Sequence, residues 1–384
     1  MCLKGSWRGA VVGLVAAFAH PLWAAQGEIA RTSTGRPDLS GTYDGATLTP
    51  VERPAELGNK MELTPEEAQK IADEQAVFLD HALRDSDPDR EAPAVGGTAV
   101  FGFEDGPAAA GAQSPIQILA AGPGAGNTGG YNWFWVDPGT NVFMVDGKFR
   151  TSILIDPPNG RMPPIRPELL KARRESFSAF RRGNDGTAWW LDRDGPGPYD
   201  DIERRPPTER CIAPFTGHTP VLPSLYNNYK SIVQTEDYVV ILLEMIHDAR
   251  IVRLKRDDRP VEHMGPEVRK WLGDSIGWWE GDTLVVDTTN FRPDSGAIQG
   301  GTENTHVVER FTKRDNGDVI YRFTVEDDTL WTASWTGEYV WQASSKKVYE
   351  YACHEGNYAM GNIMRGARLL EEETLADQEQ GRSR

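Results

Sequence analysis

The fold of this chain is decided by four segments: TLVVDTTNF (283–291), HVVERFTK (306–313), VIYRFTVED (319–327) and WTASWTGEYV (331–340). Each segment is rich in β-branched and aromatic residues, which favour strands. Turn sequences such as DNGD (315–318) separate them. Residues 231–244, 249–254 and 348–353 have the same character. We therefore predict a mainly β protein, an antiparallel β-barrel or sandwich with a few peripheral helices and long loops.

A few helices are predicted before this run of strands, and one short helix interrupts it. TPEE (64–67) supplies an N-cap, a proline at the first helical position and a capping-box glutamate, so a helix follows to about residue 84. Pro167 opens a second helix over 167–182, and a short one is expected near 266–272. The turns in 131–156 indicate an antiparallel meander.

We divide the chain by composition. Lys4 and Arg8, an apolar stretch at 9–18 and a small residue at Ala24 predict a secretory signal. The parts are a signal peptide (1–24), a strand, a helix and a Gly/Ala-rich excursion (25–130), a meander, helix and loop region (131–225), an antiparallel barrel core (226–368) and a polar tail (369–384).

The charge balance excludes several classes of partner. Lys and Arg total 41 against 57 Asp and Glu, a net charge of −16 without a basic run, so we expect neither nucleic acid nor an anionic membrane surface as a partner. After signal cleavage no run approaches the length of a membrane span. We predict a periplasmic or secreted protein. The sequence does not indicate an oligomeric state.

Two cysteines remain after the signal, Cys211 and Cys353. In an oxidising compartment they can form one disulfide that joins a loop to a late strand, and the alternative is two buried thiols. Spacing does not decide between these alternatives.

Three histidine motifs are the strongest chemical signal: MIHDAR (245–250), NTHVVER (304–310) and YACHEGN (351–357). Histidine is the commonest acid, base or metal ligand near neutral pH. We predict an enzyme pocket inside the barrel, with histidine as general base or metal ligand, a neighbouring carboxylate orienting it and an arginine countering negative charge. Its residues are His247, Asp248, Arg250, His306, His354 and Glu355.

The same histidines are candidates for a metal site, because three imidazoles can hold a divalent ion with one position open. The candidate ligands are His247, His306 and His354. No local zinc signature supports such a site, and three independent structural histidines are the simpler alternative. The GxGxxG at 124–129 lacks the strand before and the helix after that a dinucleotide site needs, so we expect no nucleotide cofactor.

Two other interpretations stay open. Tryptophans such as Trp278, Trp335 and Trp341 can line a pocket for a cyclic, aromatic or glycosidic ligand, which would make the protein a non-catalytic carrier. GDSIG (273–277) matches GxSxG, so a serine hydrolase at Ser275 is a lesser alternative. The enzyme interpretation favours a lyase, isomerase or hydrolase acting on a small molecule.

Long stretches of the chain resemble a large family of exported bacterial proteins of unknown function, and the resemblance implies export but no activity. GTY (41–43) is also similar to the Gly-x-Trp that opens lipocalin-like barrels, which favours a barrel that holds a ligand. The family stretches are PDLSGTY (37–43), YNWFW (131–135), RTSILIDPPNGRMPP (150–164), ERCI (209–212), EMIHDAR (244–250), WLGDSIGWWEGDTLVVDTTNF (271–291), ENTHVVERF (303–311) and YEYACHEGNY (349–358).

Overall fold

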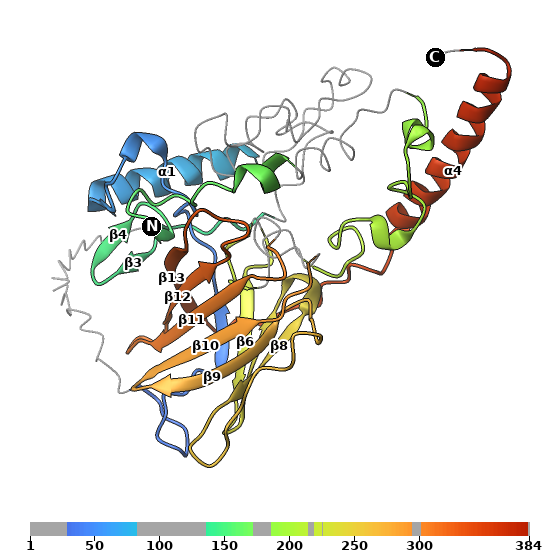
Figure 1. Ribbon diagram of the computed structural model, residues 1–384. Helices are drawn as coiled ribbons and strands as arrows, with labels where there is room; N and C mark the ends of the chain where they lie inside the picture. The colour runs from blue at the N-terminus through green and yellow to red at the C-terminus, as the bar shows by residue number, and fades with distance from the viewer. Residues whose placement is uncertain are drawn as a thin grey trace, which may run out of the picture.

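A closed β-barrel forms the centre of the computed structural model (Figure 1). Its strands belong to one ten-stranded sheet, in which β1 pairs with β6 on one side and with β13 on the other, so the sheet closes on itself. The predicted barrel is therefore confirmed, and the sandwich alternative is not. The structure describes residues 29–82, 136–171, 186–213, 219–224, 226–293 and 301–382.

The barrel strands follow one another in sequence from β6 to β13. Their order around the ring is β1-β6-β7-β8-β9-β10-β11-β12-β13. Their bounds are β1 (Gly41–Asp44), β6 (Tyr229–Gln234), β7 (Tyr238–Leu243), β8 (Ala249–Leu254), β9 (Asp274–Glu280), β10 (Thr283–Thr289), β11 (His306–Lys313), β12 (Val319–Glu326) and β13 (Trp335–Ser344).

One edge of the long strand β13 is shared by two partners. Its C-terminal end pairs with β1, which closes the barrel, whereas Thr336 and Gly337 pair with the short β5 (Leu154–Asp156) across an irregular register. The segment before the barrel core is thereby attached to its wall.

The prediction of an antiparallel barrel is wrong at one pair of strands, because β8 and β9 run parallel. Residues 255–273 return along the outside of the barrel, so β9 starts at the same end as β8. This crossover holds no helix at 266–272, where we had predicted one. The parallel pair also distinguishes the barrel from the up-and-down lipocalin type.

Three other sequence predictions are corrected by the structure. Residues 231–244, taken as one strand, form the hairpin β6–β7 around a turn at 235–237. Residues 348–353 contain no strand. The predicted polar tail is largely helical, because α4 runs over Tyr358–Glu379.

Helix α1 (Pro65–Ala82) begins as predicted, with the reciprocal capping box in place. The backbone N–H of Glu67 donates to Oγ1 of Thr64 at 3.2 Å, and the backbone N–H of Thr64 donates to the Glu67 carboxylate at 2.8 Å. A second helical turn begins at Pro167, also as predicted.

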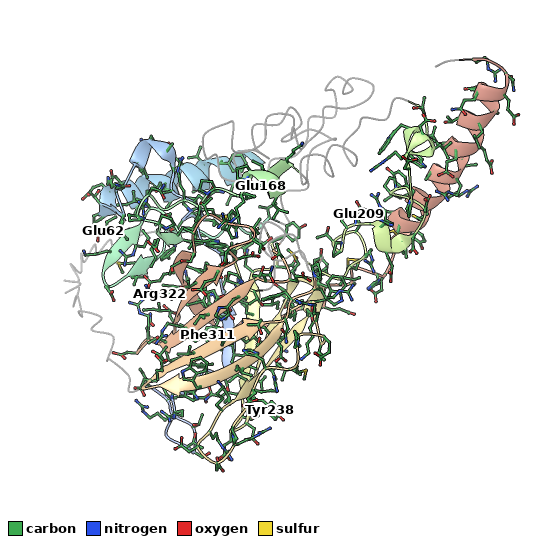
Figure 2. The ribbon with its side chains drawn as sticks, in the orientation of Figure 1. Glu62, Glu168, Glu209, Tyr238, Phe311 and Arg322 are labelled. Carbon is green, nitrogen blue, oxygen red and sulfur yellow. A yellow bond between two sulfur atoms is a disulfide. The ribbon has the colours of Figure 1, made fainter. Side chains whose placement is uncertain are left out.

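A small sheet accompanies α1 beyond one end of the barrel (Figure 1). Its central hairpin turns at Asp146 and Gly147, both at positive φ, as the Asp-Gly sequence predicts. Figure 2 shows Glu62 and Glu168 at this end and Tyr238 at the opposite end. The strands are β2 (Glu62–Leu63), β3 (Met144–Val145) and β4 (Lys148–Arg150), and the short 3₁₀ helices are η1 (Ala55–Leu57), η4 (Trp189–Asp192), η5 (Ile202–Arg204) and η6 (Met245–His247).

Aromatic side chains fill the barrel. Strand alternation directs every second residue of β11, β12 and β13 inward, and these rings contact one another edge to face or tilted. Tyr321 and Trp341, for example, have ring centroids 4.7 Å apart. The fully buried aromatic residues of this core are Tyr43, Phe291, Phe311, Tyr321, Phe323, Trp335, Tyr339 and Trp341.

Residues 186–213, which we call the arm, stand away from the barrel together with α4 (Figure 1). The indole N–H of Trp190 donates to Glu371 at 2.6 Å, and Ala367 packs on the same tryptophan. Cys211 and Cys353 form a disulfide where the arm and α4 approach the barrel. Of the two alternatives for these cysteines, the disulfide is therefore confirmed.

No helix within the described ranges is long and apolar enough to cross a membrane. Several predictions lie outside the described residues: the signal peptide at 1–24, the GxGxxG at 124–129, the YNWFW strand at 131–135 and the basic helix beyond residue 171.

Candidate active site

Two imidazoles share one carboxylate on the outer face of the barrel. Asp287 projects outward from the middle of β10. Its Oδ1 lies 2.7 Å from Nε2 of His263, and its Oδ2 lies 3.0 Å from Nε2 of His306. Because each imidazole is bound through Nε2, its other ring nitrogen faces away from Asp287.

The second nitrogen of each histidine faces another carboxylate. Nδ1 of His263 lies 3.2 Å from Asp274, and Nδ1 of His306 lies 3.0 Å from Glu326. We call these five residues, Asp274, His263, Asp287, His306 and Glu326, the outer network. It is a continuous row of alternating carboxylates and imidazoles.

The inner end of the outer network is anchored by cations. Asp274 is 1% exposed and accepts from Arg253 at 2.6 Å, from Lys270 at 2.9 Å and from the backbone N–H of Met264 at 3.0 Å. These donors outweigh burial and hold the pKa of Asp274 below its usual value. Asp274 is therefore a fixed anion that orients His263.

Strand register and the crossover bring the outer network together. His306 and Glu326 are directly opposite residues of the β11–β12 pair, and Asp287 lies on the neighbouring strand β10. His263 comes from the crossover between the parallel strands β8 and β9, which passes over the outer face of β9 and β10. The network thus depends on four strands and one long connection.

The electrostatics of the network favour a protonated His306. Its hydrogen bond to Asp287, helped by Glu326 and opposed by burial, raises the pKa of His306 to about 9. Burial acts to raise the pKa of Asp287, but hydrogen bonds from His306 and His263 outweigh it and lower that pKa. His306 is therefore an imidazolium at neutral pH, paired with an ionised Asp287.

Solvent reaches the outer end of the network. The side chain of His306 is 32% exposed and that of Glu326 is 55% exposed, whereas Asp287 is 21% exposed. A solvated carboxylate such as Glu326 binds its partner weakly, so it is easily displaced from Nδ1 of His306. An oxygen of a bound molecule can then take its place as the acceptor of that N–H.

We predicted Arg250 and His306 in one pocket inside the barrel. Arg250 lies inside the barrel, whereas His306 lies on its outer face. The Arg250 guanidinium forms a bidentate ion pair with Glu309, and the two side chains are 3% and 0% exposed. Tyr321 donates to the same carboxylate at 2.6 Å. Glu309 and His306 are three residues apart on β11, so they point to opposite faces of the wall.

A piece of the chain itself occupies the barrel beside this ion pair. The backbone N–H of Val221 donates to the Tyr321 hydroxyl at 2.9 Å, and the Tyr339 hydroxyl donates to the Val221 carbonyl at 2.9 Å. Arg250 also donates to Oγ1 of Thr219 at 3.2 Å. We call residues 219–222 the inserted segment; Val221 and Leu222 pack with the aromatic side chains of the core.

Lys230 is a buried lysine that sequence reasoning did not single out. Its ammonium donates to the Asn228 carbonyl at 2.8 Å and lies 5.1 Å from the Trp341 ring centroid. Burial lowers its pKa to about 7, against the opposing effect of Asp44 and Glu244. The only sequence signal is a lysine at an inward position of β6.

The other predicted site residues lie in separate places. The backbone of His247 ends η6 between β7 and β8, after Ile246 at φ 64°, and Asp248 accepts from the backbone N–H of Ala249 at 2.9 Å. His354 and Glu355 are exposed and lie between the disulfide and α4. The described side chains of Arg250, His306 and His354 thus have three different surroundings.

Metal binding by these histidines stays a prediction. Among the described residues, no group of three or more His, Cys, Asp or Glu side chains has the arrangement of a metal site.

Ser275 lies within β9 and is 2% exposed. Its hydroxyl shares a hydrogen bond of 2.9 Å with Thr288. A nucleophile elbow is a sharp turn from a strand into a helix with the serine exposed, and this serine has neither feature.

The tryptophans divide between the core and the outer surface. Trp331, Trp335 and Trp341 are at most 4% exposed and belong to the core. Trp278 lies on the outer face of β9, with Lys255 5.0 Å from its ring centroid. Trp133 and Trp135 lie outside the described residues.

Sequence reasoning found His306 but missed its partners. Asp287 had one weak signal, a single acid among the β-branched residues of β10. His263 stands in a polar loop without periodicity, so no pattern distinguishes it. Comparison of the chain with family models, with curated proteins and with solved structures finds no match.

Proposed function

We propose that this protein is an acid–base enzyme that acts on a small molecule at the outer network, catalysing a hydrolysis or an elimination. One observation carries the proposal: two partly exposed imidazoles are held by the single carboxylate of Asp287. Carboxylate–imidazole pairs of this kind fix the tautomer and orientation of a catalytic histidine.

His306 is the proposed general acid. Asp287 holds its Nε2–H, and Glu326 occupies Nδ1 until a substrate oxygen replaces it. The Nδ1–H then protonates the leaving oxygen as its bond breaks. In hydrolysis a water molecule adds to the other fragment, in elimination that fragment loses a proton to solvent, and a proton from solvent restores the imidazolium. His263, fixed between Asp287 and Asp274, keeps Asp287 in position.

We further propose that the protein is exported to the periplasm or secreted. The signal-like residues 1–24 and the Cys211–Cys353 disulfide support this location, because disulfides persist in oxidising compartments.

The carrier alternative has less support. Its tryptophan-lined pocket was expected inside the barrel, where Trp335 and Trp341 pack against other side chains and residues 219–222 are inserted. A co-purified ligand that is recovered unchanged after long incubation with the protein would favour this alternative.

The test is release of p-nitrophenol from a panel of p-nitrophenyl esters, phosphates and glycosides. We expect turnover of at least one class, falling as the pH rises through about 9 because His306 loses its proton. His306→Gln and Asp287→Asn should each lower kcat about 100-fold or more. Arg322→Gln, an exposed change on β12, is the matched control.

Full turnover by His306→Gln would show that the outer network is structural. Absence of turnover by the wild-type protein across the panel would also count against hydrolysis.

A further inference from the structure

A cavity of about 310 Å³ lies against the disulfide, and none of the residues that line it belongs to the outer network. Its wall includes Thr208, Glu209, Cys211, Cys353, Asn357 and Met360. Figure 2 shows Glu209 in the arm near the start of α4. A volume of this size falls at the lower end of the range of small-molecule sites. The disulfide therefore borders a space that a small molecule can enter.

The two cysteines of this disulfide differ in burial and in surroundings. Cys211 is 6% exposed, at φ 57°, whereas Cys353 is only partly buried. The side-chain amide of Asn357 donates to Sγ of Cys211 at 3.5 Å. An amide donor stabilises charge on a sulfur, so Cys211 is the better leaving group and Cys353 the more accessible target.

We propose that the Cys211–Cys353 disulfide is a site of thiol–disulfide exchange for small thiols that carry no anionic group besides the reacting sulfur. The incoming thiolate attacks Sγ of Cys353 and forms a mixed disulfide with it. The bond between Cys353 and Cys211 breaks, and its electron pair leaves with Cys211 as a thiolate that takes a proton from water.

The charge around the cavity decides the class of thiol. Arg205 forms a bidentate ion pair with Glu209 at 2.9 Å and compensates its charge. Glu355 also lines the cavity, is exposed and forms no ion pair with any described residue. The oxygen of Asn357 caps the positive end of α4 by accepting from the backbone N–H of Met360. The uncompensated Glu355 therefore disfavours an anionic thiol.

The test is the rate of exchange of the folded full-length protein with three thiols: cysteamine, 2-mercaptoethanol and 3-mercaptopropionate. Each rate is expressed per thiolate and divided by the rate of the same thiol with bis(2-hydroxyethyl) disulfide. We expect cysteamine to exceed 3-mercaptopropionate by about fivefold at low salt, with a smaller ratio at high salt. Acid-quenched peptides should carry the mixed disulfide on Cys353.

Two variants separate the effect of the Asn357 amide on the exchange rate from the effect of the Glu355 charge on the choice of thiol. Asn357→Ser keeps a side-chain cap for α4 but removes the amide donor, so exchange should slow several-fold with every thiol. Glu355→Gln should abolish the preference for cysteamine. Glu372→Gln, which removes one exposed charge further along α4, should preserve it.

Three results would overturn the proposal. They are a mixed disulfide found mainly on Cys211, an exchange rate that does not depend on thiol concentration because it is limited by unfolding, and equal normalised rates for the cationic and anionic thiols.

Discussion

At the scale of single residues, the barrel wall separates two kinds of charge. On the inside, Arg250 and Glu309 are almost fully buried and bound to each other, to Tyr321 and to Thr219. On the outside, the charges of His306 and Glu326 remain partly solvated. Burying an ion pair costs the free energy of desolvating both charges, and removing one partner leaves the other charge buried without a counter-ion. The groups of a solvated ion pair can exchange partners at little cost. We therefore place the proposed chemistry on the outer face.

The buried Arg250–Glu309 ion pair leads to a prediction about stability. Glu309→Gln leaves the Arg250 guanidinium buried without a counter-ion, so the free energy of unfolding should fall by about 3–5 kcal/mol. Urea denaturation followed by tryptophan fluorescence measures this. Glu326→Gln, at an exposed ion pair, is the control and should change stability by about 1 kcal/mol or less. Equal effects of the two changes would contradict the account of the inner pair.

The raised pKa of His306 makes a pH prediction. Its folded pKa of about 9 lies above the ordinary histidine value of 6.5, so the stabilisation is fully present below pH 6.5 and is lost as the pH rises through 9. His306→Gln should therefore cost more stability at pH 6 than at pH 10. NMR titration of the His306 ring should give a midpoint near 9, and Asp287→Asn should lower it. A wild-type midpoint near 6.5 would refute the proposed ion pair.

At the scale of elements, packing across β12 and β13 leaves room for only a hydrogen at Gly337. A Cβ at this position would lie 2.3 Å from the Phe323 ring. Gly337 also marks the irregular register where β5 joins β13. The small residue thus lets an aromatic core side chain and an extra strand meet at one point of the wall.

We expect Gly337→Ala to destabilise the protein by about 1–3 kcal/mol, because the added methyl group forces the Phe323 ring to move. The matched change is Gly366→Ala in α4, where the new methyl group meets no atom within 4 Å. It should be neutral or stabilise by up to about 1 kcal/mol, since alanine favours helix. Thermal unfolding of both variants measures the two changes in stability. If Gly337→Ala left the stability unchanged, the packing argument would be contradicted.

At the scale of the whole molecule, the disulfide joins the two ends of the barrel core. Cys211 precedes β6 and Cys353 follows β13, at a sequence separation of 142. The bond therefore encloses every barrel strand except β1, and it also holds the arm beside the start of α4. Its effect on stability should come mainly from the unfolded chain, whose loop it closes.

Replacing both cysteines by serine should lower the free energy of unfolding by about 2–4 kcal/mol. The barrel should keep its far-ultraviolet circular dichroism spectrum, because no barrel strand contains either cysteine. Thr64→Ala, which removes only the cap of α1, should cost about 1 kcal/mol and serves as a comparison. Stability unchanged by the double replacement would show that the unfolded chain gains little freedom.

Several elements could be predicted from the sequence because their causes are local. The capping box set the start of α1, the Asp-Gly pair set the β3–β4 turn, and the β-branched runs set β10 to β12. The strand β9 was missed because its GDSIGWW sequence has glycine and serine in place of β-branched residues. Helix α4 was missed because its apolar residues cover only a narrow face and its charges suggested a solvated tail.

By itself, the sequence determined a mainly β fold, the starts of α1 and of the helical turn at Pro167, and one histidine of the outer network, since propensity, capping and turn chemistry act over a few residues. Only the tertiary structure decided the parallel β8–β9 pair, the outward position of His306 and the meeting of His263 with Asp287. These features depend on which strands become neighbours and on their register. Register is set by the packing of the whole core, so no local pattern contains it.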